Sequence, residues 1–279
     1  MIREIPVARI REAVETLLSE AAYRLPADYL AGLEASAPAE PSPIGRQVIE
    51  LLLENSAYAQ AEQIPTCQDT GMAMLFLEVG QEVHFSGGDL HGAIQDGVRA
   101  AYASLRKSVV GDPIRRANTG DNTPGLIHYE IVAGDRVGLT VLQKGFGAEL
   151  VSRLQMFPPS VGVEGVKRYV VETIELAGPN ACPPVIVGVG LGGSFDTVAH
   201  LAKKALLRPI GSLHPAPHLA GLEADLLDAI NRTGIGPQGL GGRVTALAVH
   251  IEAGATHIGA LPVAVNLNCS APRRARVEI

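Results

Sequence analysis

The residues of this sequence that are best suited to metal chemistry are its three cysteines, Cys67, Cys182 and Cys269. Each lies in a segment rich in polar or helix-breaking residues rather than inside a helical or strand pattern. A cysteine that only fills apolar core is expected inside such a pattern, whereas the backbone amides of a loop can face a thiolate. An odd number of widely spaced cysteines is also a poor disulfide framework. We therefore predict that these sulfur atoms bind a metal centre.

Thiolate ligands favour either zinc or an iron–sulfur cluster. A structural zinc site usually has four ligands and a Cys-x-x-Cys pair; this sequence has no such pair, and His257 would be the candidate fourth ligand. Three separate thiolates match a [4Fe–4S] cluster that leaves one iron open to bind a substrate oxygen as a Lewis acid. The spacing alone leaves a cluster, zinc and three apolar cysteines as alternatives.

Six motifs in the sequence resemble, in order, those of the α subunit of class I, iron–sulfur-dependent fumarate hydratases. This family also includes the α subunits of L-tartrate dehydratases. The resemblance extends from about residue 40 to the C-terminus, and the six motifs together are far more specific than any one of them. They are PTCQDTG at residues 65–71, NTGDNTP at 118–124, KGFGAE at 144–149, NACPP at 180–184, GIGPQGLGG at 234–242 and THI at 256–258.

The resemblance implies a role for eight residues of this sequence. It implies a [4Fe–4S] cluster on the cysteines, a set of residues that reach the substrate, and a catalytic pair. The sequence departs from the family pattern at two places: Ser270 follows the last cysteine where many fumarases carry histidine, and Ala148-Glu149-Leu150 after Gly147 is a milder change. The implied residues are Cys67, Cys182 and Cys269 for the cluster, Gln68, Asp69, Arg106 and Gly147 for the substrate, and Asp69 with His257 for catalysis.

The chemistry of these residue types agrees with such roles. The guanidinium of Arg106 can pair with a carboxylate through two parallel hydrogen bonds, unless it is a surface arginine at a helix end. Asp69 and His257 can form a proton relay, because histidine titrates near neutral pH and a carboxylate can fix its tautomer. The simpler alternatives are an Asx-turn for Asp69 and a structural histidine. Gly147 lacks a Cβ, so its backbone N–H can approach a substrate carboxylate.

The resemblance also implies a substrate and a partner. The expected reaction is the reversible hydration of fumarate to (S)-malate, with L(+)-tartrate dehydration and mesaconate hydration as alternatives for the same kind of small dicarboxylate. Single-chain relatives carry the remaining site residues in a C-terminal domain that has no counterpart after Cys269 here. A separate β subunit is therefore implied, in an α2β2 assembly.

Other classes of protein fit the sequence less well. The formal net charge of −6 argues against a nucleic-acid partner. Neither a membrane span nor a secretory signal is recognisable, so we expect a cytoplasmic protein. Residues 188–193 satisfy the Gly-x-Gly-x-x-Gly pattern of a dinucleotide-binding oxidoreductase, but the acidic ribose partner expected about 20 residues later is missing. A non-catalytic scaffold that has lost its cluster is a third alternative, and the retained cysteine, aspartate, arginine and histidine positions speak against it.

The elements that must position these residues follow from hydrophobic periodicity and turn signals. We predict a mixed α/β (α+β) fold with N-terminal helices over residues 1–62, followed by two α/β lobes over 63–279 whose loops converge on the iron–sulfur site. All 279 residues would form one catalytic domain. The basic cluster at 273–276 is interpreted as a solvated tail. The expected helices are 6–35, 44–61, 90–105, 164–177, 194–207 and 219–233, and the expected strands are 72–79, 127–132, 137–143 (these two as a hairpin), 183–189, 244–251 and 261–266.

Overall fold

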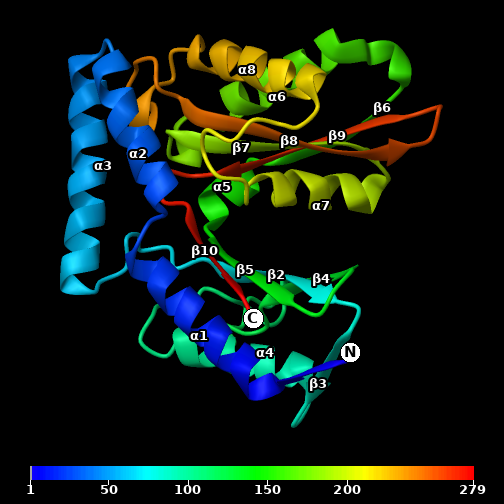
Figure 1. Ribbon diagram of the computed structural model, residues 1–279. Helices are drawn as coiled ribbons and strands as arrows, with labels where there is room; N and C mark the ends of the chain where they lie inside the picture. The colour runs from blue at the N-terminus through cyan, green and yellow to red at the C-terminus, as the bar shows by residue number, and fades with distance from the viewer. Residues whose placement is uncertain (1) are drawn as a thin grey trace. The chain divides into compact units, whose positions relative to one another are not determined.

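The computed structural model of the chain describes residues 2–279. It has the mixed α/β fold predicted from the sequence, and the chain is organised into two compact units. Unit 1 comprises residues 2–26, 56–146 and 272–279, and unit 2 comprises residues 27–55 and 147–271. Each unit has its own four-stranded sheet (Figure 1), and each has its own apolar core.

Unit 1 is a four-stranded sheet with the strand order β10-β5-β2-β4, and helices α1 and α4 lie on one of its faces (Figure 1). Its core joins the apolar side of α1, represented by Ile10 and Val14, to Leu75 and Leu77 of β2. A small parallel pair of β1 and β3 completes the unit. The elements are β1 (Arg3–Pro6), α1 (Val7–Tyr23), β2 (Met72–Gly80), β3 (Val83–Ser86), α4 (Leu90–Ala101), β4 (Leu126–Val132), β5 (Val137–Lys144) and β10 (Arg273–Glu278).

Unit 2 is a second four-stranded sheet, with the order β6-β9-β7-β8. Helices α6 and α8 cover one face and α7 covers the other (Figure 1). The elements are α2 (Ala27–Ser36), α6 (Gly162–Ala177), α7 (Phe195–Ala205), α8 (Pro217–Asn231), β6 (Arg153–Phe157), β7 (Val185–Gly193), β8 (Ala246–Thr256) and β9 (Leu261–Asn268). Two helices, α3 (Pro43–Glu62) and α5 (Phe146–Leu150), contain residues of both units. Short 3-10 turns are formed by Ala37–Ala39, Pro159–Val161, Gly178–Ala181 and Pro237–Gly239.

The first predicted helix is divided in two. The apolar residues that repeat at helical spacing in α1 are buried, but α1 ends at Tyr23 and α2 begins at Ala27. Pro26 lies between them, and proline disfavours helical geometry at the residue before it. The consequence is that α1 contributes to unit 1 and α2 to unit 2.

The predicted hairpin of residues 127–132 and 137–143 is wrong. Both strands exist, but β2 lies between them, parallel to β4 and antiparallel to β5. The turn signal around Gly134 marks a real reversal of the chain, because strands β4 and β5 run in opposite directions. A turn signal does not state which strand pairs with which, and the apolar β2 occupies the centre of the sheet.

The basic cluster at residues 273–276 is not a solvated tail. It forms β10, which pairs antiparallel with β5. Arg273 is 1% exposed, and its Nε and Nη1 have no hydrogen-bond partner among residues 2–279. Arg276 is the solvated member of the cluster, and its guanidinium pairs with Glu78 at 2.7 Å. The alternation of a strand at a sheet edge explains why neighbouring arginines differ so much in exposure.

The glycines of residues 188–193 do not form a phosphate-binding loop, because β7 continues through Gly193. They allow α7 to approach the strand closely. A Cβ on Gly188 would lie 2.2 Å from the carbonyl oxygen of Ala202, and one on Gly190 would lie 2.2 Å from that of Val198. The Gly-x-Gly-x-x-Gly pattern is thus explained by helix–strand packing. None of the helices in the described residues is long and apolar enough to cross a membrane.

Candidate functional site

Cys67 and its neighbours form the loop that leads into β2. The loop is attached to the end of α1, because the backbone N–H of Thr66 donates to the carbonyl of Ala22 at 3.0 Å. Cys67 is half-buried and Gln68 is exposed. The Cys67 Sγ lies 3.7 Å from the Gln68 Oε1, which makes the amide oxygen the acceptor of a weak thiol hydrogen bond. The thiol is therefore held at the surface of unit 1, in a polar environment.

Next to this loop, unit 1 has a hollow of about 310 Å³. It brings together three residues that the sequence assigned to the substrate, Gln68, Asp69 and Arg106, although Arg106 is 37 positions beyond Asp69 in the chain. Lys107 and Ser108 complete the lining. A hollow that contains a carboxylate, an amide and a guanidinium has the hydrogen-bonding groups that a small polar acid requires.

The carboxylate of Asp69 has a fixed orientation. Its Oδ1 accepts the backbone N–H of Gly71 at 2.9 Å, and its Oδ2 accepts that of Phe146 at 2.8 Å. The bond to Gly71 is the Asx-turn expected as the simpler alternative. The bond to Phe146 links distant segments, because it connects the loop before β2 to the KGFGAE motif at the end of β5. Both carboxylate oxygens keep further lone pairs for a ligand.

The segment with Arg106 is fixed by its backbone and leaves the side chain available. The hydroxyl of Thr70 donates to the Arg106 carbonyl at 2.6 Å, and Tyr102 donates to the Thr70 carbonyl at 3.0 Å. Burial raises the pKa of the Tyr102 hydroxyl, with the charge of Asp69 acting in the same direction and that of Arg273 opposing it. The Tyr102 hydroxyl therefore keeps its proton, and remains a donor, at neutral pH.

Arg106 and its neighbour Lys107 differ in what their side chains bind. The Lys107 Nζ donates to three carbonyls at the end of α4, those of Tyr102, Ala103 and Leu105, at 2.6–2.8 Å. The exposed guanidinium of Arg106 has no hydrogen bond or ion pair within the described chain. Lys107 therefore closes the helix end, and Arg106 is the cation of this hollow that is free to bind a ligand.

Asn122 holds two segments of this candidate site together, a role that the sequence did not reveal. It lies in the NTGDNTP motif, is fully buried and has a left-handed φ of 65°. Its Oδ1 accepts the N–H groups of Ser108 and Val109 at 2.6 and 3.1 Å, and its Nδ2 donates to the Gly71 carbonyl at 3.1 Å. One amide side chain therefore connects the Arg106 segment to the Asp69 segment. The sequence marks Asn122 only as part of the NTGDNTP motif, and a motif does not show which groups its side chains contact.

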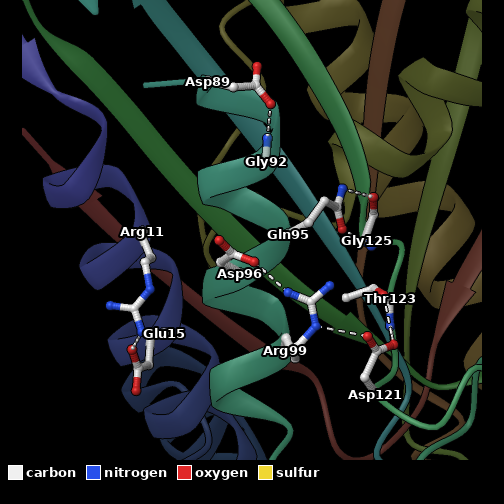
Figure 2. Close-up of polar contacts among 10 residues, drawn as sticks. All are labelled: Arg11, Glu15, Asp89, Gly92, Gln95, Asp96, Arg99, Asp121, Thr123 and Gly125. Carbon is white, nitrogen blue, oxygen red and sulfur yellow. Dashed lines mark hydrogen bonds and ion pairs between the residues drawn. The ribbon is translucent and has the colours of Figure 1, made fainter. Parts of the chain in front are cut away.

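The loop with Asn122 is attached to α4 by charged side chains (Figure 2). Arg99 pairs with Asp96 on its own helix and donates to Asp121 at 2.9 Å. Asp121 also accepts the hydroxyl and the backbone N–H of Thr123. These hydrogen bonds, the Thr123 hydroxyl foremost, hold the pKa of the Asp121 carboxyl well below its ordinary range. At the other end of α4, the side chain of Asp89 accepts the N–H of Gly92 and caps the helix (Figure 2).

A second hollow of about 230 Å³ adjoins the first, since Asp69 and Ser108 line both. Its walls are largely apolar, and its charged residue besides Asp69 is Arg116, which has a left-handed φ of 61°. Nothing in the sequence distinguishes Arg116 from the neighbouring basic residues. Its place beside Asp69 follows from the loop that Asn122 fixes. The remaining lining residues are Met72, Val109, Val110 and Phe146.

Unit 2 brings the other two cysteines next to each other. Strands β7 and β9 are antiparallel neighbours, with Ile186 opposite Asn268. Cys182 precedes β7 and Cys269 follows β9, so this register places both at the same end of the sheet. The N–H of Ser270 donates to the Cys182 carbonyl at 3.0 Å, which joins the two loops directly. Cys182 is exposed, with a left-handed φ of 52°, and Cys269 is half-buried.

Tyr29 holds the Cys269 loop through a hydrogen bond to its backbone. It is fully buried, and its hydroxyl donates to the Ser270 carbonyl at 2.8 Å. Burial raises the pKa of this hydroxyl, and the nearby charge of a Cys269 thiolate raises it further. The tyrosine therefore keeps its proton at neutral pH and holds the backbone immediately after Cys269.

The two remaining predicted residues both belong to unit 2. His257 is exposed in the turn between β8 and β9, where its Nδ1 accepts the N–H of Gly259 at 3.1 Å. That bond leaves Nε2 as the nitrogen that can exchange protons with a ligand. Gly147 is exposed in the short helix α5, and a Cβ there would lie 3.4 Å from the Asn180 carbonyl oxygen. The open surface at Gly147 agrees with close approach of a ligand to its backbone.

The donor set suits an iron–sulfur cluster. None of the three cysteines forms a disulfide within residues 2–279, each lies in a loop, and two of them are joined by adjacent backbone in unit 2. Cys67 belongs to unit 1, and among residues 2–279 no three histidine, cysteine, aspartate or glutamate side chains are grouped closely enough to hold one metal ion. The structure therefore groups two of the three predicted ligands within one unit, and it groups Gln68, Asp69 and Arg106 within the other.

Comparison with known proteins identifies the family. The model of the fumarate hydratase (Fumerase) family matches residues 11–278. L(+)-tartrate dehydratase subunit alpha of Escherichia coli strain UTI89 is 38% identical over 279 residues, covering 98% of this chain and 91% of that protein. The protein of that name from Escherichia coli O157:H7 is 39% identical over 274 residues, or 96% and 90%. A Methanocaldococcus jannaschii protein, for which that name is provisional, is 40% identical over 274 residues, 96% of each chain. The chain therefore belongs to the fumarate hydratase family and is a hydro-lyase.

Proposed function

We propose that this chain is the α subunit of a hydratase that adds water reversibly to fumarate, giving (S)-malate. The observation that carries this proposal is the hollow in unit 1, where the unpaired guanidinium of Arg106 lies with the oriented carboxylate of Asp69 and the amide of Gln68. A guanidinium and an amide bind a substrate carboxylate, and a fixed carboxylate accepts or delivers a proton. These are the groups that hydration of an unsaturated dicarboxylate requires.

The cofactor that we propose is a [4Fe–4S] cluster on Cys67, Cys182 and Cys269. When bound, a cluster with three protein thiolates supplies a Lewis-acidic iron that polarises the bond between carbon and the hydroxyl oxygen. The cysteine environments support this assignment, because soft thiolates in polar loops are typical ligands of such clusters. Two exposed or half-exposed thiols on adjacent loops of unit 2 provide part of the required set.

Each of the remaining residues has a task within this proposal. Arg106 binds one carboxylate of the substrate and fixes its orientation. Asp69 and His257 hold and move the proton that is added to or removed from carbon, with Nε2 of His257 as the exchanging nitrogen because Nδ1 accepts the Gly259 N–H. The backbone N–H of Gly147 stabilises the negative charge that develops on a carboxylate as the proton leaves carbon.

A β subunit completes the site in this proposal. The relatives that match over 90% or more of their own length are named as α subunits. In the hollow of unit 1 Arg106 is the one cation whose side chain is free among the described lining residues, while a four-carbon dicarboxylate carries two negative groups. The second carboxylate therefore needs a cation from outside this hollow. Arg116 lines the adjoining hollow, and we propose that a β subunit in an α2β2 assembly supplies the remaining groups.

L(+)-tartrate is the second candidate substrate, and the names of the relatives favour it. Tartrate dehydration breaks the same kind of C–O bond and uses the same carboxylate-binding groups. The difference is a second hydroxyl, which needs one additional hydrogen-bond partner. Mesaconate differs from fumarate by one methyl group, for which the apolar second hollow beside Asp69 offers space.

One experiment separates these possibilities. The chain is coexpressed with its β-subunit partner, reconstituted anaerobically with iron and sulfide, and assayed on fumarate, (S)-malate, L(+)-tartrate and mesaconate. We expect turnover of fumarate and malate with the highest kcat/KM, together with visible absorbance from the cluster. Cys67→Ser should abolish both. Turnover of tartrate alone would assign the alternative substrate, and a Cys67→Ser variant that kept its cluster would overturn the ligand assignment.

A further inference from the structure

The loop between α8 and β8 contains a glutamine in an unusual conformation. Gln238 has φ 52° and ψ 19°, in the left-handed region that glycine and asparagine adopt more readily. A residue other than glycine or asparagine is strained in that region. The fold keeps a long amide side chain at this position, so the side chain itself must contribute contacts that offset the cost.

Those contacts lead to both cysteine loops of unit 2. The backbone N–H and the Nε2 of Gln238 each donate to the Pro183 carbonyl at 2.7 Å, and Pro183 directly follows Cys182. The same Nε2 donates to the Ser270 hydroxyl at 3.0 Å, and Ser270 directly follows Cys269. One amide nitrogen therefore bridges the residue after one cysteine to the residue after the other.

The loop that carries Gln238 is itself fixed at its base. The carboxylate of Glu40, which is 1% exposed, accepts the N–H groups of Arg243 and Val244 at 2.7–3.0 Å. Gly236 donates its N–H to the hydroxyl of Thr245 at 3.0 Å. A flexible loop could close over the cysteines only at an entropic cost, whereas this one is already ordered.

We propose that Gln238 is a positioning residue that clamps the Cys182 and Cys269 loops at a fixed separation, so that unit 2 presents two thiolates to the cluster together. The simpler alternative is a loop that only fills space, and it would need neither the long side chain nor its bridge between two separate loops. The role in cluster binding depends on the proposed function, while the clamp itself is a property of the folded chain. Ser270 takes part as the acceptor, which gives the serine at this position a specific task.

The clamp can be tested without a cluster. In the apo αβ complex carrying Cys67→Ser, dibromobimane becomes fluorescent when its two arms react with Cys182 and Cys269. Gln238→Asn keeps a residue that accepts left-handed φ but shortens the side chain by one methylene. We expect the bridging rate, which is the rate at which dibromobimane joins the two thiols, to fall at least about fivefold, as for the loss of one or two neutral hydrogen bonds. The matched control is Gln63→Asn, since Gln63 also has a left-handed φ but bonds only within its own turn.

The same variants, with Cys67 restored, test cluster retention. We expect the Gln238→Asn complex to lose iron to a chelator at least about fivefold faster than wild type and the Gln63→Asn complex, with little change in Tm. An unchanged bridging rate in a folded Gln238→Asn complex would overturn the clamp. A bridging rate that falls while iron loss does not would overturn its role in cluster retention. A wild-type complex that takes up no iron and sulfide would instead overturn the proposed function, and the bimane rate would still decide the clamp.

Discussion

The hydroxyl of Thr70 donates to the backbone carbonyl of Arg106 at 2.6 Å, although 36 residues separate them in the chain. This bond attaches the segment with the free guanidinium to the segment with Asp69, and the 2% exposure of Thr70 protects it from water. The relative position of the two groups in the unit 1 hollow therefore depends on buried backbone contacts. Substrate binding should be sensitive to residues that never touch the substrate.

Thr70→Val tests this dependence. Valine keeps the shape of threonine but leaves the Arg106 carbonyl without its donor, so we expect a loss of about 1–3 kcal/mol in the free energy of unfolding. KM for the dicarboxylate should also increase, because Arg106 is no longer held beside Asp69. Thr70→Ser keeps the hydroxyl and is the control. Urea unfolding and steady-state kinetics of both variants decide the prediction, and equal KM values would contradict it.

Arg106→Met and Lys107→Met should separate binding from stability. Arg106→Met removes the free cation, and we expect KM to rise at least about tenfold, as for the loss of a charged hydrogen bond. Its Tm should change little, since no described residue pairs with that side chain. Lys107→Met leaves the three carbonyls at the end of α4 without their donor. It should lower the free energy of unfolding by about 1–3 kcal/mol and leave KM nearly unchanged. If Arg106→Met lowered the free energy of unfolding and Lys107→Met raised KM, the roles assigned to the two residues would be wrong.

Asp121 should make the stability of unit 1 depend on acid pH. Its pKa is lowered in the folded chain by Thr123 and Arg99. A lowered carboxyl pKa contributes stability that is fully present above the ordinary value of about 4 and is lost as the pH falls toward the folded value. Because Asp121 is partly exposed, the contribution is on the order of 1 kcal/mol. Unfolding of wild type and Asp121→Asn between pH 6 and pH 3 should show their difference shrinking on acidification, and a constant difference would argue against the prediction.

Gly188→Ala tests the packing explanation of the Gly-x-Gly-x-x-Gly pattern. Its Cβ would meet the Ala202 carbonyl oxygen at 2.2 Å, so α7 must move, and we expect a loss of about 1–3 kcal/mol of stability. Gly221→Ala is the matched control, because Gly221 is exposed in the middle of α8 with open space around it. That change should stabilise the chain by about 0.5–1 kcal/mol.

Titration of wild type with NADH should show no binding, and saturable binding would revive the dinucleotide alternative.

The sequence alone was sufficient for features that depend on neighbouring residues. A helix over the residues of α1 was predicted from hydrophobic periodicity, and the start of α4 at residue 90 was predicted in the same way together with turn signals. The loop location of all three cysteines was also predicted correctly. These features are local, because side-chain periodicity and turn preferences are properties of a few consecutive residues.

Pairing between distant segments could not be predicted in this way. The hairpin failed because β2, which is more than 50 residues before β5, takes the central place in the sheet. Arg273 was assigned to a solvated tail and is buried in β10. A strand at the end of the chain and a flexible basic tail have the same local composition, and only the free edge of β5 distinguishes them.

For the site, residue types and motifs lead to a prediction of the reacting groups, whereas the contacts that hold their segments are seen only in the folded chain. Residue types and motif order were sufficient to predict Asp69, Arg106 and the three cysteines as site residues. The contacts through Thr70 and Gln238 became visible only in the fold, since each joins segments at least 30 residues apart. Such contacts depend on chain closure and strand register, which are settled by the packing of the whole unit rather than by the residues that make the contact.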